Sequence, residues 1–131
     1  FIVLSNPQLG TRGGRRVVGD YVVREKDMKA KAPFKDTIAI FPNMDKENAL
    51  MYMPYRCLIP RGVDNMLVAC RAFSSDAIIN DAFNLIHHCV SLGQAAGAAA
   101  AQAVNAGVDV RKVNIGALQA TLKKQGVVLP G

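Results

Sequence analysis

The chain has 131 residues, of which 50% are hydrophobic and 20% charged, and it carries a formal charge of +6 at pH 7. This composition favours a packed globular core and excludes a disordered chain. The positive charge permits an anionic partner without selecting one, and no apolar run reaches the roughly 18 residues that a membrane-spanning helix needs.

The start of the sequence and the spacing of its cysteines indicate where in the cell the protein is located. The first residue is Phe1, and nothing near it is typical of a secretion signal, so we expect the sequence to start inside a longer protein. The three cysteines, Cys57, Cys70 and Cys89, are widely spaced and contain no CxxC pair. This spacing favours reduced thiols in a cytoplasmic protein over a disulfide framework or a zinc site.

The first third of the chain predicts strands and then a short helix. Residues 17–23 are rich in β-branched side chains, which indicates one or two strands, and Gly13 and Gly14 allow a turn or a close approach. The charged residues 24–31 favour a helix that the following proline ends. Residues 34–40 form a short amphipathic stretch.

The middle of the chain predicts extended segments around a turn. Residues 50–59 are typical of extended structure, although Pro54 excludes a central strand there. Residues 60–65 predict a turn. The apolar run at 66–70 is of the kind that is buried on both faces of a parallel sheet. Residues 71–80 predict a loop with a helical turn.

The last third predicts helices. Residues 82–106 favour a long helix that is broken or bent near Gly93, and Gly107 is suited to end it. Asn114 predicts the cap of a second, amphipathic helix that runs to about Lys124.

Small residues at 92–97, Leu-Gly-Gln-Ala-Ala-Gly, allow another backbone or a flat ligand to come close to the long helix. The start of a helix also offers free N–H groups and a partial positive charge, which suit an electron-rich oxygen. On the residues alone, both interpretations stay open: a helix that simply packs tightly, and a helix that receives a ligand.

Four segments together give a more specific signal. They are residues 10–19, 54–60, 65–71 and 92–97. In this order they resemble the bacterial-type FAD-dependent oxidoreductases related to fumarate-reductase flavoproteins, over about residues 9–125. The resemblance implies an α/β fold: the C-terminal segment of a Rossmann-like FAD-binding domain, at 49–131, plus a few strands and short helices of the substrate-side domain, at 1–48.

The resemblance implies FAD as the cofactor. In the family, the strand at 66–69 ends against the flavin, and the helix at 92–97 points its N-terminus at the flavin's pyrimidine edge, where reduced flavin carries negative charge. Carried over to this sequence, the implied cofactor-binding residues are Cys70, Arg71, Gly93, Gln94, Ala95, Ala96 and Gly97.

The implied catalytic residues are Arg15, Arg12 and His88. An arginine on the substrate side can hold a carboxylate by two hydrogen bonds. Because neighbouring strand residues face opposite ways, we pair Arg15 with Arg12 rather than with Arg16. His88 is a candidate proton donor or acceptor, although a histidine on an apolar helix is also often a core residue. Residues 74–81 depart from the family's histidine-containing loop, which leaves the substrate open.

The sequence therefore predicts part of a flavin-dependent oxidoreductase that contributes the flavin-ring side of the FAD site and acts on a small organic substrate. The Gly-x-Gly-x-x-Gly fingerprint that grips ADP is missing, so the alternative is an inactive fragment or subunit that needs another chain to complete the site. A nucleic-acid-binding module is disfavoured, because the Arg-Gly-Gly at 12–14 has no interleaved aromatic residues. Exposed apolar surface predicts self-association of the chain.

Overall fold

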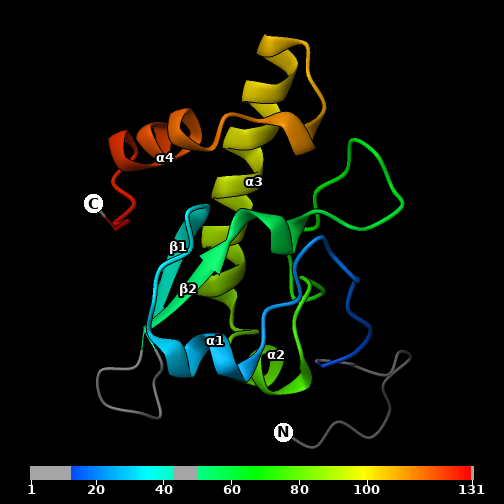
Figure 1. Cartoon of the computed structure of the whole chain (residues 1–131), viewed down its shortest axis with the longest axis vertical. Coiled ribbons are helices and arrows are strands. Elements are labelled where there is room, and N and C mark those ends of the chain that lie inside the picture. Colours follow the sequence, from blue (N-terminus) through cyan, green and yellow to red (C-terminus); the bar gives the residue numbers. More distant parts are fainter. Residues whose placement is uncertain (1–12, 43–49, 131) are drawn as a thin grey trace, which may run out of the picture.

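The computed structural model describes residues 13–42 and 50–130. Within these residues the elements, in chain order, are α1 (Glu25–Ala30), β1 (Thr37–Pro42), β2 (Leu50–Pro54), the 3-10 helix η1 (Tyr55–Leu58), α2 (Ala77–Ala82), α3 (Ile86–Ala106), the 3-10 helix η2 (Val110–Lys112) and α4 (Ile115–Lys124). Figure 1 shows α3 as the long central helix, with β1 and β2 lying along it, α4 crossing its upper half, and α1 and α2 at its lower end.

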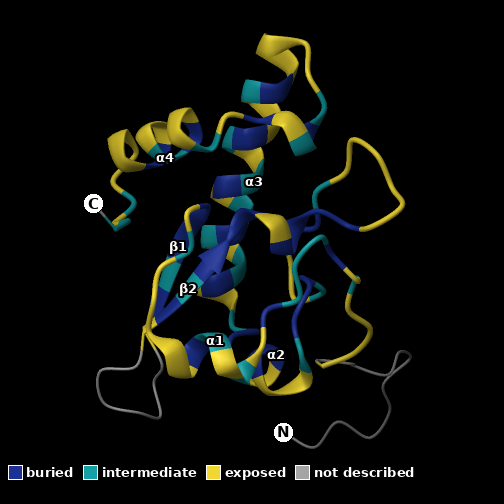
Figure 2. Ribbon diagram, in the orientation of Figure 1, coloured by how far each residue is buried: buried dark blue, intermediate teal, exposed yellow. Residues whose placement is uncertain are grey.

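The sheet of the described residues is a single antiparallel pair. Its register runs from Thr37 opposite Pro54 to Pro42 opposite Leu50, with an irregularity between Thr37 and Ala39. Both strands end on a proline, which cannot donate to the ladder and is therefore tolerated at a strand end. Figure 2 shows the pair mostly buried where it lies against α3. A small sheet and several helices make a mixed fold that is compatible with an α/β piece of an FAD-binding domain.

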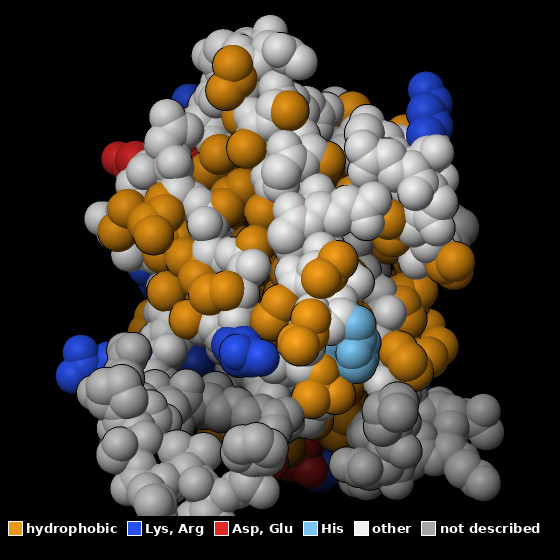
Figure 3. All heavy atoms as spheres, turned by 180° about the vertical axis from the view of Figure 1, so that it is seen from behind, with side chains coloured by type: hydrophobic (Ala, Val, Ile, Leu, Met, Phe, Trp, Pro, Cys, Tyr) orange, Lys and Arg blue, Asp and Glu red, His pale blue; other side chains and the backbone are white. Residues whose placement is uncertain are grey.

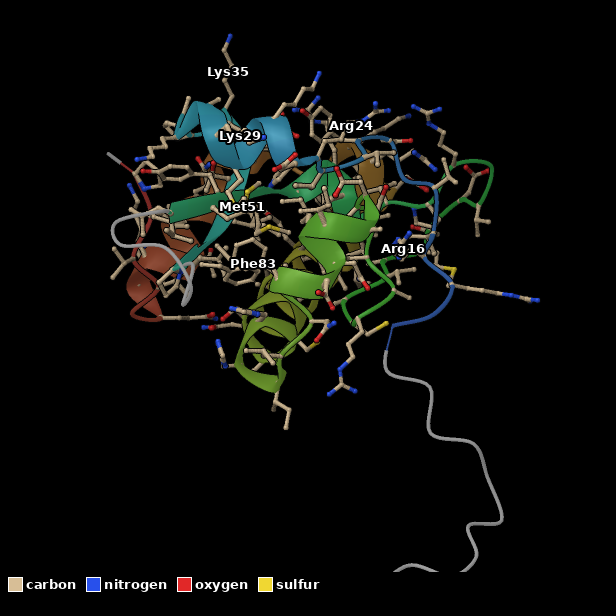
Figure 4. The ribbon with its side chains drawn as sticks, turned by 90° about the horizontal axis from the view of Figure 1, so that it is seen from below. Arg16, Arg24, Lys29, Lys35, Met51 and Phe83 are labelled. Carbon is tan, nitrogen blue, oxygen red and sulfur yellow. The ribbon has the colours of Figure 1, made fainter. Side chains whose placement is uncertain are left out.

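One hydrophobic core runs through the described residues, from Val23 near the start to Leu122 in α4. Met51 and Phe83 are among its fully buried side chains, and Figure 4 shows both lying inside the molecule, while Lys35 points away from it. The expected boundary between residues 48 and 49 falls between β1 and β2, which pair with each other. The two predicted parts of the chain therefore share this hairpin and this core.

Residues 17–23 do not form the expected strands. The segment is extended but makes only two isolated bridges, Gly19 to Pro60 and Val23 to Ser75. It pairs first with one neighbouring segment and then with another, so no continuous ladder forms. The strand prediction was wrong because β-branched residues fix an extended backbone and do not fix its partner.

Gly19 is the glycine at which the backbone comes close to a neighbour. A Cβ there would lie 2.8 Å from the Cβ of Ser74 and 3.0 Å from the carbonyl oxygen of Ile59. Its N–H donates to the Ser74 hydroxyl at 2.9 Å. A Cβ at Gly13 or Gly14 would meet no atom of the described residues within 4 Å. Of the turn or close approach expected at Gly13 and Gly14, a close approach among the described residues is found at Gly19 instead.

Residues 66–70 also lack a strand in the described structure. The Val68 N–H donates to the Leu58 carbonyl at 2.8 Å, and no described strand lies beside this segment. Val68 is 9% exposed, but Met66 is 45% exposed and Cys70 is exposed as well. The prediction that residues 66–70 form a strand buried on both faces was therefore wrong.

Helix α3 is continuous over 21 residues, so of the break or bend expected near Gly93 the break is wrong. It begins after Leu85, whose backbone is extended, and ends at Gly107, whose φ of 63° is the left-handed conformation predicted for a glycine stop. Along one side it buries Ala95 and Ala99, whose small side chains let neighbouring elements pack close to the helix axis.

The predictions of a charged helix at 24–31 and of an amphipathic helix after Asn114 are confirmed. Helix α1 spans Glu25–Ala30 and is capped by Lys31, two residues before Pro33. In α4 the Asn114 side chain accepts the Ala117 N–H at 3.0 Å, and Leu118 and Leu122 are fully buried on one side. Among the described residues, no helix combines the length and apolarity needed to cross a membrane.

Arg111 ties distant parts of the chain together. Its backbone N–H is capped by the Asp109 carboxylate at 2.7 Å. Its guanidinium pairs with Asp20 and donates to the carbonyls of Pro60 and Val63, the latter at 3.1 Å. The predicted turn at 60–65 is thus held by a side chain from far along the sequence.

Candidate functional site

A cleft of about 630 Å³ opens beside the first turn of α3. Three segments line it: the start of the described chain, the coil before α2, and α3. The lining residues are Gly14, Arg15, Cys70, Arg71, Ala72, Ile86, Cys89 and Val90. The structure thus brings together three of the residues implied by the family resemblance, Arg15, Cys70 and Arg71.

Arg71 is held in place from both of its ends. Its Nε donates to the Asn84 carbonyl at 2.8 Å, and its own carbonyl accepts the Asn80 side-chain amide at 2.7 Å. Asn80 lies in α2, which Asp76 caps by accepting the Ile79 N–H at 2.9 Å. The short helix α2 therefore fixes the guanidinium just before the start of α3.

The start of α3 adds a second source of positive potential. The first backbone N–H that donates to the carbonyl four residues earlier is that of Cys89, which bonds to Leu85 at 3.2 Å. The N–H groups of residues 86–88 lie ahead of that bond, at the positive end of the helix dipole. Arg71, Leu85, Ile86 and His87 also line a hollow of about 490 Å³. This end of α3 is suited to an electron-rich oxygen or an anion.

Residues 93–97 lie further along α3, away from its N-terminus. Their N–H groups are inside the helix, so the expectation of free backbone donors at 94–96 is wrong: the helix already begins at Ile86. Ala95 is fully buried in the core, and the Gln94 side-chain amide donates to Gln125 at 3.0 Å. None of these five residues lines the cleft.

Gly93 and Gly97 nevertheless continue the line of Ile86 and Val90 along α3. The spacing of these four residues, i, i+4, i+7 and i+11, places them on one face of a helix. A Cβ at either glycine would meet no described atom within 4 Å. Ile86, Val90 and Val104 are 73%, 64% and 80% exposed on this face, and Figure 3 shows hydrophobic side chains scattered over this side of the molecule.

His88 is a core residue in the described structure. Its side chain is 1% exposed and packs against Phe41 and Phe83, with ring centroids 4.4 Å and 5.3 Å away. Neither ring nitrogen has a hydrogen-bond partner among the described residues. Burial, reinforced by the neighbouring His87, lowers the pKa of His88 to about 4, although the Phe83 backbone opposes this shift. His88 is therefore neutral at pH 7 and does not line the cleft.

The two neighbouring arginines at the start of the described chain diverge. Arg15 is exposed at the cleft, whereas the Arg16 Nε donates to the Ser75 carbonyl at 3.1 Å. Arg12 lies outside the described residues. Other basic residues lie around α1, where Lys29 pairs with Glu25 at 2.8 Å, and Figure 4 shows Lys29 and Lys35 at the outer surface.

Sequence reasoning missed the part of the cleft that α3 provides, namely Ile86, Cys89 and Val90. Placing the helix start at about 82 and a break or bend near 93 moved the expected N-terminus to the wrong place. The sequence offered no signal for the observed start, because the residue before the helix is Leu85, whose side chain makes no capping hydrogen bond.

Comparison with known proteins gives one family. The sequence matches the family model described as FAD dependent oxidoreductase over residues 2–122. Comparisons with the curated proteins and with the solved structures give no match.

Proposed function

Because the chain belongs to the FAD-dependent oxidoreductase family, we propose that its cleft beside α3 forms the flavin-ring side of an FAD site. The family's cofactor is FAD, and its members act as oxidoreductases. The main observation in support of this proposal is that Arg71 and the positive end of α3 lie at the same cleft.

The residues of the cleft fit a flavin ring. Its volume of about 630 Å³ lies within the range of small-molecule sites in proteins. Ala72, Ile86 and Val90 offer apolar contact to a flat ring, while Arg71 and the start of α3 offer positive charge to its pyrimidine edge. This assignment moves the charge-stabilising contacts from residues 94–96 to the first turn of α3.

When bound, FAD supplies hydride or electron transfer to or from a small organic substrate. Arg71 and the N–H groups of residues 86–88 stabilise the negative charge that a reduced flavin carries. Arg15, on the same cleft, holds an anionic group of the substrate. Gly93 and Gly97 leave room on the same face of α3 for the cofactor or another backbone to approach.

We place the chain in the branch related to fumarate-reductase flavoproteins, on the four motifs in register. The sequence contains no Gly-x-Gly-x-x-Gly motif of the kind that binds the ADP part of FAD. We therefore propose that residues outside these 131 bind the ADP part. On this proposal the chain alone recognises the ring and not the nucleotide. The exposed apolar face of α3, with Ile86, Val90 and Val104, is where the chain self-associates in isolation.

Flavin fluorescence tests this proposal on the 131-residue chain. Riboflavin and FAD are titrated with protein, and we expect quenching with affinities that agree within about threefold, because the ADP half finds no site. Arg71→Gln weakens binding by about tenfold or more, since a hydrogen bond to a charged group is worth about 1.5 kcal/mol or more and 1.4 kcal/mol is a factor of ten. Arg61→Gln, an exposed arginine that does not line the cleft, is the matched control and leaves the affinity unchanged.

Two results would contradict the proposal. Equal binding by the wild-type and Arg71→Gln proteins would remove Arg71 from the site. Competition by ADP, with tight FAD binding and weak riboflavin binding, would show that the chain grips the nucleotide instead.

A further inference from the structure

Two of the three cysteines face the same cleft. Cys70 lies in the coil before α2, and Cys89 lies in the first turn of α3; both line the cleft of about 630 Å³ together with Arg71. Cys57, in η1, is fully buried in the core. The fold therefore separates the cysteines into a pair on one accessible wall and a single inaccessible residue.

The two thiols of the cleft differ in their surroundings. Cys70 is exposed, and its sulfur accepts the Ala72 backbone N–H at 3.4 Å. Cys89 is half-buried, and burial raises its pKa, while the guanidinium of Arg71 acts in the opposite direction. The negative charge of a Cys70 thiolate acts in the same direction as burial and raises the pKa of Cys89.

We propose that Cys70 and Cys89 are a redox pair that closes to a disulfide on the wall of this cleft. Cys70 is the attacking thiol because it is exposed and carries the N–H contact. Cys89 is the resolving thiol, because it is less accessible and shares the cleft. The proposal stands whether or not a flavin occupies the cleft.

The step needs an oxidant, and the class that fits an open cleft is a small disulfide such as oxidised glutathione. The Cys70 thiolate attacks one sulfur of the oxidant, forming a mixed disulfide and releasing one glutathione thiolate. The Cys89 thiolate then attacks the Cys70 sulfur and releases the second. The two cysteines lose two protons and two electrons, and the oxidant is reduced to two thiols.

The new bond would join the coil that carries Arg71 to the first turn of α3. Cys70 lies outside the helices and strands, in a turn where its carbonyl accepts the Phe73 N–H at 3.0 Å. Closing the bond requires this turn to meet the narrow geometry of a disulfide. Closure would fix the wall of the cleft between Cys70 and Cys89 and remove both thiols from it. Access to the cleft would then depend on the redox state of the pair.

Intact mass and peptide mapping test the pair on the full chain. After incubation with oxidised glutathione, we expect a species that is lighter by two hydrogens and that returns to the starting mass with a reductant. Cleavage after arginine separates the cysteines, because Cys57 falls in residues 57–61, Cys70 in 62–71 and Cys89 in 72–111. The expected linked peptides are 62–71 and 72–111.

Variants separate the pair from nonspecific oxidation. Cys57→Ala still closes the bond. Cys70→Ser and Cys89→Ser do not, and each instead gains one glutathione on the remaining cleft thiol. Arg71→Gln slows closure by about fivefold or more, because it removes the nearby positive charge from the thiolates.

The proposal is overturned if the wild-type chain gains glutathione on Cys70 and never loses it to Cys89. It is also overturned if the linked peptides include residues 57–61, or if the only disulfide found joins two copies of the chain. Thiol counting on the folded chain with a fluorescent maleimide gives an independent reading: two thiols react before oxidation and none afterwards, while Cys57 reacts only in denaturant.

Discussion

Arg56 holds the nearly buried carboxylate of Asp36 by two side-chain hydrogen bonds, Nε to Oδ2 at 2.9 Å and Nη2 to Oδ1 at 3.2 Å. The Arg56 backbone N–H also donates to Oδ2 at 3.2 Å, and the guanidinium lies 5.0 Å from the centre of the Tyr21 ring. Asp36 is 7% exposed, so its charge is compensated chiefly by this arginine. The pair fixes the start of β1 to η1.

We expect Arg56→Gln to lower the free energy of unfolding by about 2 kcal/mol, because it leaves a buried carboxylate without its ionic partner. Urea unfolding followed by circular dichroism measures the loss. Lys29→Gln is the matched control: its pair with Glu25 is exposed, so the loss there is below about 0.5 kcal/mol. Equal losses in the two variants would show that Asp36 does not depend on Arg56.

Gly19→Ala should destabilise the chain by about 2 kcal/mol. The added Cβ would lie 2.8 Å from the Cβ of Ser74, and the backbone on both sides would have to move. Gly13→Ala, where a Cβ meets no atom within 4 Å, serves as the control and leaves the unfolding midpoint in place. A neutral Gly19→Ala would mean that the two segments are not packed against each other in solution.

Acid should destabilise the fold through His88. The unfolded histidine takes up a proton near pH 6.5, whereas burial lowers the pKa of folded His88 to about 4. Between these pH values the unfolded state binds more protons, so this contribution to stability is present above pH 6.5 and falls by about 3 kcal/mol as the pH drops to 4.

The His88 effect is measured as the unfolding midpoint from pH 7 to pH 4. His88→Phe keeps a ring between Phe41 and Phe83 and removes the titrating group, so its stability stays flat over this window. His87→Gln leaves His88 in place, so the main slope remains. If His88→Phe kept the wild-type slope, other groups would be responsible for the acid sensitivity.

Gly97→Ala should stabilise the isolated chain by about 0.5–1 kcal/mol, since alanine has the higher helix propensity and the added Cβ meets open space. Thermal unfolding of the purified chain measures the gain. A loss of stability would show that something packs on this face of α3, such as a second copy of the chain. The measurement at several protein concentrations distinguishes that case.

Local signals in the sequence predicted the elements whose ends are set by a single residue. Asn114 caps the start of α4, Gly107 caps the end of α3, and Lys31 caps the end of α1 shortly before a proline. Each of these ends follows from the type of residue at that position or close to it in the sequence. The turn at 60–65 was likewise predicted from its glycine and asparagine, both of which adopt positive φ.

Non-local pairing could not be predicted from the same signals. Residues 17–23 and 66–70 have the composition of strands, but whether they form a ladder depends on which segments lie beside them. For the cleft, the family resemblance named Arg15, Cys70 and Arg71, which line it in the structure, and their roles stay predictions. It missed Ile86, Cys89 and Val90, because their contribution depends on where α3 begins.

The ties made by Arg111 bear on how the chain folds during synthesis. The Arg111 side chain is synthesised long after its three partners, Asp20, Pro60 and Val63, so these contacts cannot form until it has emerged from the ribosome. Such contacts between residues far apart in sequence slow folding, because long loops must close before any stability is gained. We therefore expect the contacts that hold the turn at 60–65 to form only after η2 has been synthesised.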